Sequence, residues 1–180
     1  LIGLVGSEMC IRDRVVVILC MIFGGGSWKT PINNVMDVLN DGDGKAYEEL
    51  MPPYYKDMAD ALDGIIDISD EDFDEEAEKQ RDRLTKKYGD DAEISYEVVK
   101  KTEVDSDDID SYNEVSDVAS ILSSKKAKKY KLTKAYKVKI KYTIEGEDAD
   151  KTDKTTVIVG KMDGTWVLLD EGDLPISTGF

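Results

Sequence analysis

Proton transfer and metal binding in proteins rely heavily on histidine and cysteine side chains, and this sequence is nearly without both. Its 180 residues include no histidine and only two cysteines, Cys10 and Cys20, both near the N-terminus. Beyond Cys20 the chain therefore offers no imidazole, no thiolate nucleophile, no disulfide and no cysteine ligand for a metal. Carboxylates and tyrosines are left for acid–base chemistry. We predict no catalytic residue, no cofactor and no metal site.

Residues 40–44 alternate carboxylates with glycines, as the calcium-binding loop of an EF-hand does. Placing Gly44 at the sixth position of that loop puts Leu39 at the first position and Leu50 at the last, where a carboxylate should stand. The calcium pattern therefore fails. We interpret the segment as a turn between two helices, because Asn, Asp and Gly are turn formers.

Carboxylates are also frequent across residues 57–78. Oxygen-rich surfaces of this kind can collect divalent cations weakly. The spread of these acids over two helix ends and a loop favours a simpler interpretation, namely a solvated face with charges at a helix start.

Residues 125–141 contain nine lysines and no arginine, interleaved with tyrosines. This mixture can bind nucleic acid or anionic wall polymers. It also suits a half-buried strand, because Lys137, Lys139 and Lys141 fall on its outward positions, where lysine prevents edge pairing. We interpret these lysines as structural, attracted to the acidic helices. The net charge of −15 argues against a nucleic-acid partner.

Each of the two tryptophans has a structural interpretation and a functional one. Trp166 falls in the last predicted strand, where we expect a packing anchor, with ligand stacking as the alternative. Trp28 follows an apolar run, and we interpret it as an aromatic residue at a membrane interface rather than a binding residue.

Helical patterns occupy the first half of the chain. Thr30 can cap a helix that has Pro31 in its first turn. The apolar residues of one face follow at helical spacing: Ile32, Val35, Met36 and Leu39. A second helix is predicted over residues 47–62, interrupted by a proline pair, and a third over residues 72–88.

Strand patterns dominate the second half. The predicted strands are residues 92–104, 132–145, 155–162 and 166–169. Asp163 and Gly164 form a strong two-residue hairpin signal, and a helix is predicted over residues 106–122. Helices followed by antiparallel strands predict an α+β fold in which N-terminal helices cover the apolar face of a curved sheet of about four strands.

Four passages carry a resemblance: DGDGKAYEELMPP, KKYGDDAEISYEV, AYKVKIKYTI and GKMDGTWVLL. Together they resemble NTF2-like, cystatin-type lipoprotein and anchored domains of unknown function, which are common in Gram-positive bacterial envelopes. The resemblance covers nearly all of residues 29–170. It implies a curved sheet wrapped on helices around a cone-shaped cavity. It implies no activity, because this fold hosts enzymes, binders and adaptors.

The N-terminal region has a different character. Residues 4–14, LVGSEMCIRDR, resemble a translated adapter of a transposase-type sequencing library, so we exclude residues 1–14 from fold reasoning. Residues 15–23, VVVILCMIF, are apolar and precede a glycine tether, but a bilayer span needs about 20 residues. We interpret residues 15–27 as the end of a truncated transmembrane anchor, with a secretory signal second and a lipoprotein signal third. Residues 28–180 then form one extracytoplasmic domain.

These observations favour a non-catalytic binding or interaction module, anchored at the cell membrane, whose partner is an unidentified ligand or envelope protein. The alternative is an enzyme of the ketosteroid isomerase or dehydratase kind, which uses a buried carboxylate and a tyrosine without histidine. A carboxylate that lines a closed cavity within hydrogen-bond reach of a tyrosine would favour the enzyme.

Overall fold

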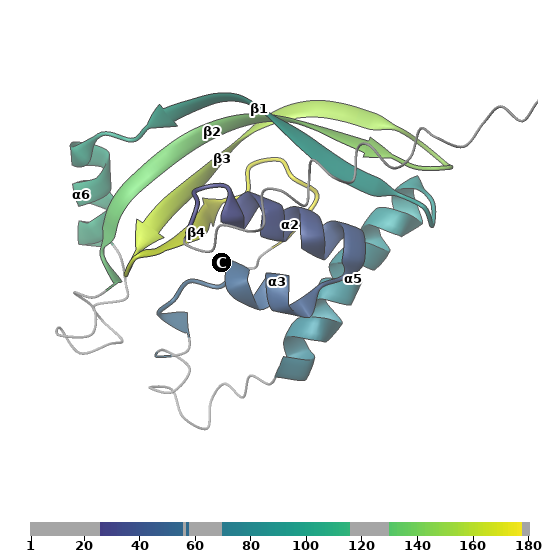
Figure 1. Cartoon of the computed structure of the whole chain (residues 1–180), viewed down its shortest axis with the longest axis horizontal. Coiled ribbons are helices and arrows are strands. Elements are labelled where there is room, and N and C mark those ends of the chain that lie inside the picture. Colours follow the sequence, from purple (N-terminus) through teal and green to yellow (C-terminus); the bar gives the residue numbers. More distant parts are fainter. Residues whose placement is uncertain (1–25, 56, 58–69, 116–129, 178–180) are drawn as a thin grey trace, which may run out of the picture.

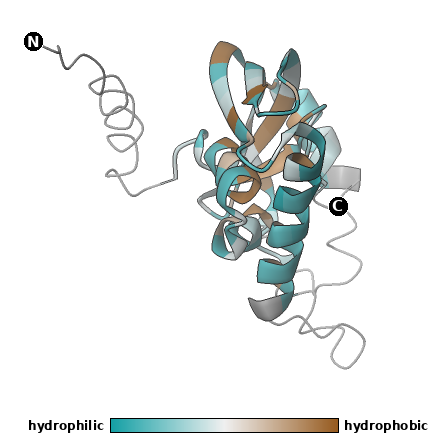
Figure 2. Cartoon of the chain, turned by 90° about the vertical axis from the view of Figure 1, so that its right-hand side faces the viewer, coloured by the Kyte–Doolittle hydropathy of each residue, from teal (hydrophilic) through white to brown (hydrophobic). Residues whose placement is uncertain are grey.

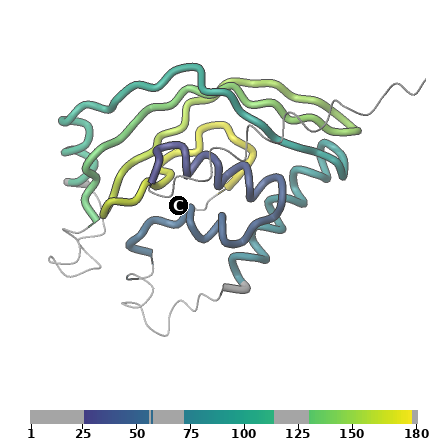
Figure 3. The backbone as a smooth tube through the Cα atoms, in the orientation of Figure 1, coloured from purple at the N-terminus to yellow at the C-terminus, as the bar shows by residue number. Residues whose placement is uncertain are grey.

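The structure, a computed structural model, describes residues 26–55, 57, 70–115 and 130–177. The elements in chain order are α2 (Thr30–Asp41), α3 (Gly44–Leu50), α5 (Asp70–Tyr88), β1 (Glu93–Glu103), α6 (Ser106–Val115), β2 (Leu132–Glu145), β3 (Lys151–Met162) and β4 (Thr165–Asp170). An antiparallel sheet arches over α2, α3 and α5 (Figures 1 and 3). The predicted α+β class and the sheet of four strands are confirmed.

The strands pair in the order in which they follow along the chain, β1-β2-β3-β4, and every neighbouring pair is antiparallel. Strands β2 and β3 are therefore central, and β1 and β4 are the two edges of the sheet. The bounds of β2 agree with the prediction, whereas β3 begins at Lys151, before the predicted residue 155. Asp163 and Gly164 have φ values of 46° and 82°, as a hairpin turn with two left-handed residues requires.

Helix α2 supplies the central apolar stripe beneath the sheet. All four residues predicted for its buried face are buried. The predicted cap is wrong, because Thr30 lies inside the helix and Lys29, which precedes it, makes no side-chain capping bond. The helix ends at Gly42, whose φ of 66° and N–H bond to the Val38 carbonyl close the last turn.

The other helices agree with the prediction as far as they are described. Helix α3 ends at Leu50, just before the proline pair, and residues 58–69 lie outside the described residues. Helix α5 is hydrophilic along most of its outer surface (Figure 2) and buries Ala77, Gln80 and Leu84. Helix α6 is described as far as Val115, so the predicted continuation to residue 122 also lies outside the described residues.

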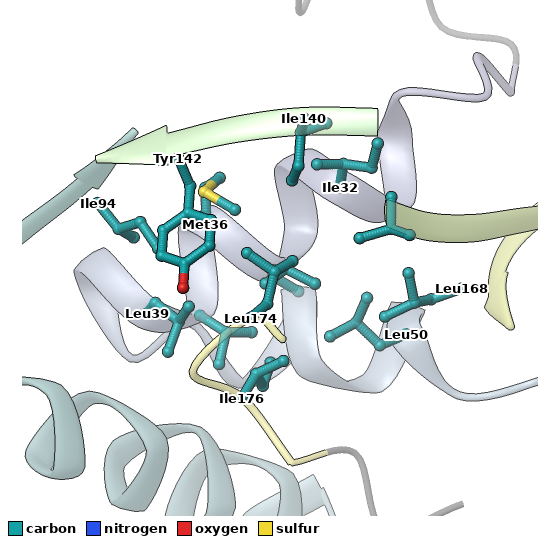
Figure 4. Packing of buried hydrophobic residues seen from close by; sticks show 14 of the residues in the cluster. Ile32, Met36, Leu39, Leu50, Ile94, Ile140, Tyr142, Leu168, Leu174 and Ile176 are labelled. Carbon is teal, nitrogen blue, oxygen red and sulfur yellow. The ribbon is translucent and has the colours of Figure 1, made fainter. Parts of the chain in front are cut away.

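The segment that follows β4, residues 171–177, runs back beneath the sheet. Its side chains Leu174 and Ile176 are 5% and 7% exposed and belong to the main core (Figure 4). Ser177 is fastened to the Gln80 side chain, which donates to its carbonyl at 3.1 Å and accepts from its N–H at 3.3 Å. This segment therefore fills space under the arch where the family resemblance implies a cavity.

Candidate functional site

The turn at residues 40–44 has a structural role. The Asp43 carboxylate accepts hydrogen bonds from the N–H groups of Lys45 and Ala46, at 2.9 and 3.1 Å, and so caps α3. Among the described residues there is no cluster of carboxylate, cysteine or histidine side chains that could hold a metal. The interpretation of this segment as a turn is confirmed.

The described acids of residues 57–78 lie mostly on α5. Asp74 and Glu78 are exposed to solvent. Lys79 Nζ lies 2.8 Å from the Glu75 carboxylate and 3.7 Å from that of Glu76, one helical turn away. From Asp72 to Glu78 the acids of α5 form a solvated helix face, as predicted, whereas Asp57 is half-buried and accepts from Tyr130. Residues 58–69 lie outside the described part of the chain.

Chain folding also gathers acids that the sequence separates. A hollow of about 560 Å³ lies where β1 begins and the β2–β3 turn passes. Its lining residues are Asp91, Glu93, Glu145, Gly146, Glu147 and Asp150. Asp91 accepts from the Glu147 N–H at 2.8 Å and Asp150 accepts from the Gly146 N–H at 3.2 Å, so two of these carboxylates hold the turn together. Sequence reasoning missed this hollow, because only the strand register brings its residues together.

One tyrosine–carboxylate pair matches the type that an isomerase would use. The Tyr130 hydroxyl donates to the Asp57 carboxylate at 2.7 Å, and the Tyr54 ring packs edge-on against Tyr130. Tyr54 contacts the smaller apolar cluster that includes Leu132 and Met162. The pair therefore lies beside that smaller cluster and apart from the main core beneath the sheet.

The two tryptophans both pack against Tyr136 on the inner face of the sheet. Trp166 is 8% exposed and stacks on Tyr136 with 5.3 Å between ring centroids, which confirms its role as a packing anchor. Trp28 is half-buried and packs edge-on against the same tyrosine. Lys101 Nζ lies 4.3 Å from the Tyr136 ring centroid and 4.9 Å from that of Trp28. The tryptophan expected at a membrane interface thus packs on the body of the protein.

An irregularity in β1 explains how Lys101 reaches these rings. Val98 pairs with Ile140 on the inner face, but the register shifts by one residue before Lys100. Val99 is the extra residue and is 52% exposed. After this bulge Lys101 lies opposite Val138 on the inner face, while Lys100 lies opposite Lys139 on the outer face.

The outer face of the sheet carries the most concentrated positive charge among the described residues. We define the lysine face by the residues that the register places there: Lys100, Lys137, Lys139, Lys141 and Lys154. Because β2 is central, its lysines do not protect a sheet edge, and that part of the sequence interpretation is wrong. The register places them on the outer face, whereas α2, α3 and α5 lie beneath the sheet (Figure 1). Lys137 alone meets a helix, with its Nζ 3.5 Å from the Asp108 carboxylate of α6.

Like charges stand directly opposite each other on the lysine face. Lys100 is the register partner of Lys139, and Lys141 is the partner of Lys154. Such pairs are unfavourable, whereas opposite charges in the same positions stabilise a sheet by about 0.2–1 kcal/mol per pair. None of these four lysines forms an ion pair with a described residue, although Glu97 stands opposite Lys141.

This arrangement runs against the composition of the chain, which has 39 acidic residues and 24 basic ones. Acids are abundant on the helices, so a face selected only for stability would be expected to alternate charges here. Uncompensated violations of a local rule are typical of functional surfaces. Four neighbouring outward positions carry threonine hydroxyl groups, which belong to Thr102, Thr143, Thr152 and Thr156, and others carry Ser95, Glu97 and Ile158.

The acidic helix α5 weakens this positive field only slightly. It contacts α2 and α3, and these two helices contact the sheet, α2 at β1 and β4 and α3 at β4. With about 8–10 Å between packed layers, the α5 acids lie roughly two layers from the lysine face. The Debye length at physiological salt is about 8 Å, so their field is largely screened there.

Comparison of the chain with protein-family models, with curated proteins and with solved structures finds no match. Within the described ranges, no helix has both the length and the apolar character needed to cross a membrane. The apolar run at residues 15–23 lies outside those ranges.

Proposed function

We propose that this chain is a non-catalytic binding module of NTF2-like fold, held by its N-terminal segment on the extracytoplasmic side of a bacterial cell membrane. The observation that carries the binding role is the lysine face of an acidic chain, where lysines stand opposite lysines and four of the five form no ion pair with a described residue. The order of helices before a curved antiparallel sheet supports the NTF2-like fold. The apolar run and glycine tether at residues 15–27 support the anchor.

The tyrosine hydroxyl groups beneath the sheet support a structural role for the inner face rather than a catalytic one. The Tyr142 hydroxyl donates to the Asp173 carbonyl at 3.2 Å and accepts from Lys151 Nζ at 2.7 Å. Burial, with a contribution from the Glu76 charge, raises the pKa of Tyr47 to about 12. The Tyr47 hydroxyl therefore keeps its proton at neutral pH and does not serve as a base there.

Retention on phosphocellulose tests the proposed binding surface. A protein of net charge −15 is repelled by this resin unless one face binds locally. We expect the full chain, in non-ionic detergent, to be retained at low salt and to elute at lower salt when Lys100, Lys139, Lys141 and Lys154 are changed to glutamine.

The matched control changes four lysines of the helices to glutamine and removes the same charge: Lys45, Lys79, Lys86 and Lys87. Elution of this control at the wild-type salt concentration supports the lysine face. Passage of the wild-type chain through the column without retention would refute the proposal.

The enzyme alternative has one specific observation in its favour, the hydrogen bond between Tyr130 and Asp57. An enzyme of this kind would isomerise a β,γ-unsaturated ketone, with the carboxylate moving the proton. We expect no turnover of such a ketone by the purified chain. Turnover that Asp57→Asn abolishes would establish the enzyme instead.

A further inference from the structure

We infer that the lysine face binds a linear polymer that carries phosphate groups in its backbone and has no nucleobases. This inference rests on the proposed function, because it names the chemical class of the ligand for the same surface. The lysines concerned are those without an ion pair among the described residues: Lys100, Lys139, Lys141 and Lys154.

The geometry of the sheet fixes the spacing of the charges. Lys139 and Lys141 are two residues apart on β2, which separates their attachment points by roughly 7 Å. Each has a lysine partner on a neighbouring strand, Lys100 on β1 and Lys154 on β3, at a strand separation of about 5 Å. The result is a row of paired ammonium groups that crosses three strands, which suits a ligand with repeated negative charges.

A folded protein partner is disfavoured by the composition of this face. Stable protein interfaces contain buried aromatic or large apolar anchors, with lysine depleted at their centre. The positions around these lysines are mainly threonines, with one half-buried apolar residue, Ile158, and one acid, Glu97. The aromatic residues Trp28, Tyr136 and Trp166 lie on the inner face. A flat membrane surface is disfavoured too, because the lysine face is the convex side of the arch (Figure 3) and lacks interfacial aromatic residues.

The side-chain chemistry favours backbone phosphates over other polyanions. Lysine is a point charge that binds phosphate without base or sequence recognition, and threonine hydroxyls can donate to the same oxygens. A polymer with charge in its backbone also loses less side-chain entropy on binding than a carboxylate polymer does. Single-stranded nucleic acid usually needs aromatic platforms for its bases, and the outward positions of this face provide none.

The test measures binding of long-chain inorganic polyphosphate to the full chain in non-ionic detergent over a series of salt concentrations. If each lysine contacts one phosphate, the logarithmic salt slope is about −0.7 per contact, hence about −3 for the four lysines. Affinity should then fall roughly 60-fold between 50 and 200 mM salt. The variant with all four lysines changed to glutamine should lose most of this dependence, and the helix control with Lys45, Lys79, Lys86 and Lys87 changed should keep it.

Three probes distinguish failure of this inference from failure of the proposed function. Poly-L-glutamate, single-stranded DNA or phosphatidylglycerol bicelles that bind more tightly than polyphosphate, through the same four lysines, would overturn the ligand class and leave the binding face intact. If no anionic probe separates the wild-type chain from the lysine-face variant, or if the helix control loses as much affinity as that variant, both are overturned.

Discussion

Single residues decide where the elements of this protein touch. Asn40 is one of them, since its amide accepts from the Ile94 N–H at 2.7 Å and donates to the Ile94 carbonyl at 3.0 Å. Asn113 holds Leu132 in the same way, at 2.8 and 3.0 Å. Each asparagine thus replaces the missing neighbour of a strand residue near a strand end.

Changing Asn40→Ala should lower the free energy of unfolding by about 1–3 kcal/mol, because both backbone groups of Ile94 lose their partner. Urea unfolding followed by circular dichroism measures the change. The variant Asn40→Asp keeps the acceptor but sets a carboxylate oxygen against the Ile94 carbonyl oxygen, so it should not restore wild-type stability. A loss of less than about 0.5 kcal/mol in Asn40→Ala would contradict the role of these two bonds.

Gly146 sets the distance between the β2–β3 turn and α5. A Cβ atom at this position would lie 2.1 Å from the Tyr88 carbonyl oxygen, which itself accepts from the Asp148 N–H. The added Cβ atom would clash with backbone atoms of Tyr88, which cannot move aside as a flexible side chain can. Gly146→Ala should therefore destabilise the protein by about 1–3 kcal/mol through overpacking. The exposed variant Asp148→Ala, which keeps its N–H, should stay within about 0.5 kcal/mol of wild type in the same urea titration.

At the scale of elements, the local sequence pattern predicts individual helices and strands but does not predict which strands pair with one another. The strict alternation of β2 and the Asp-Gly turn were sufficient for correct strand and hairpin assignments. The start of β3 was missed because residues 151–154 are polar and owe their strand conformation to pairing with β2. The bulge at Val99 and the central place of β2, which together create the lysine face, depend on register between distant segments. No local periodicity encodes that register.

Helix α2 carries an unfavourable charge near its C-terminal end. Burial raises the pKa of the Asp37 carboxyl above its usual 3.8, and neighbouring carboxylates add to the rise. Those neighbours are Asp41, Asp43 and Glu49. The folded protein therefore binds this proton more readily than the unfolded chain does, so ionised Asp37 destabilises the fold at neutral pH.

We predict that Asp37→Asn increases the free energy of unfolding at pH 7. The gain should shrink as the pH falls through the raised pKa of Asp37 and should vanish below about 3.8, where both states of the wild type are protonated. Urea titrations between pH 3 and pH 7 measure it. A gain that persisted at the lowest pH would show that the side-chain amide acts by another route. Asp82→Asn, on the exposed side of α5, serves as the control.

At the scale of the whole molecule, one core joins both ends of the described chain. Ile32, Ile140 and Ile176 belong to the same cluster of buried side chains. The segment after β4 therefore helps to fill the space beneath the sheet. Periodicity in the sequence could not predict this role, because residues 171–177 form neither a helix nor a strand.

Changing Leu174→Ala should cost about 2–5 kcal/mol of unfolding free energy, since its buried side chain leaves a cavity under the sheet. Val98→Ala is the matched control, because Val98 is apolar but 38% exposed, and it should cost clearly less. Thermal or urea unfolding compares the two. Similar losses would mean that the segment after β4 contributes little to the core.

The late position of Leu174 and Ile176 also affects biosynthesis. Translation adds about 5–20 residues per second. The apolar face of α2 therefore stays uncovered for on the order of ten seconds, until the strands, Leu174 and Ile176 have been synthesised. Nascent chains that stall before these residues expose that face to proteases. Products that contain Leu174 and Ile176 can close the core, so premature termination within the final strands should yield degraded fragments instead of a smaller stable body.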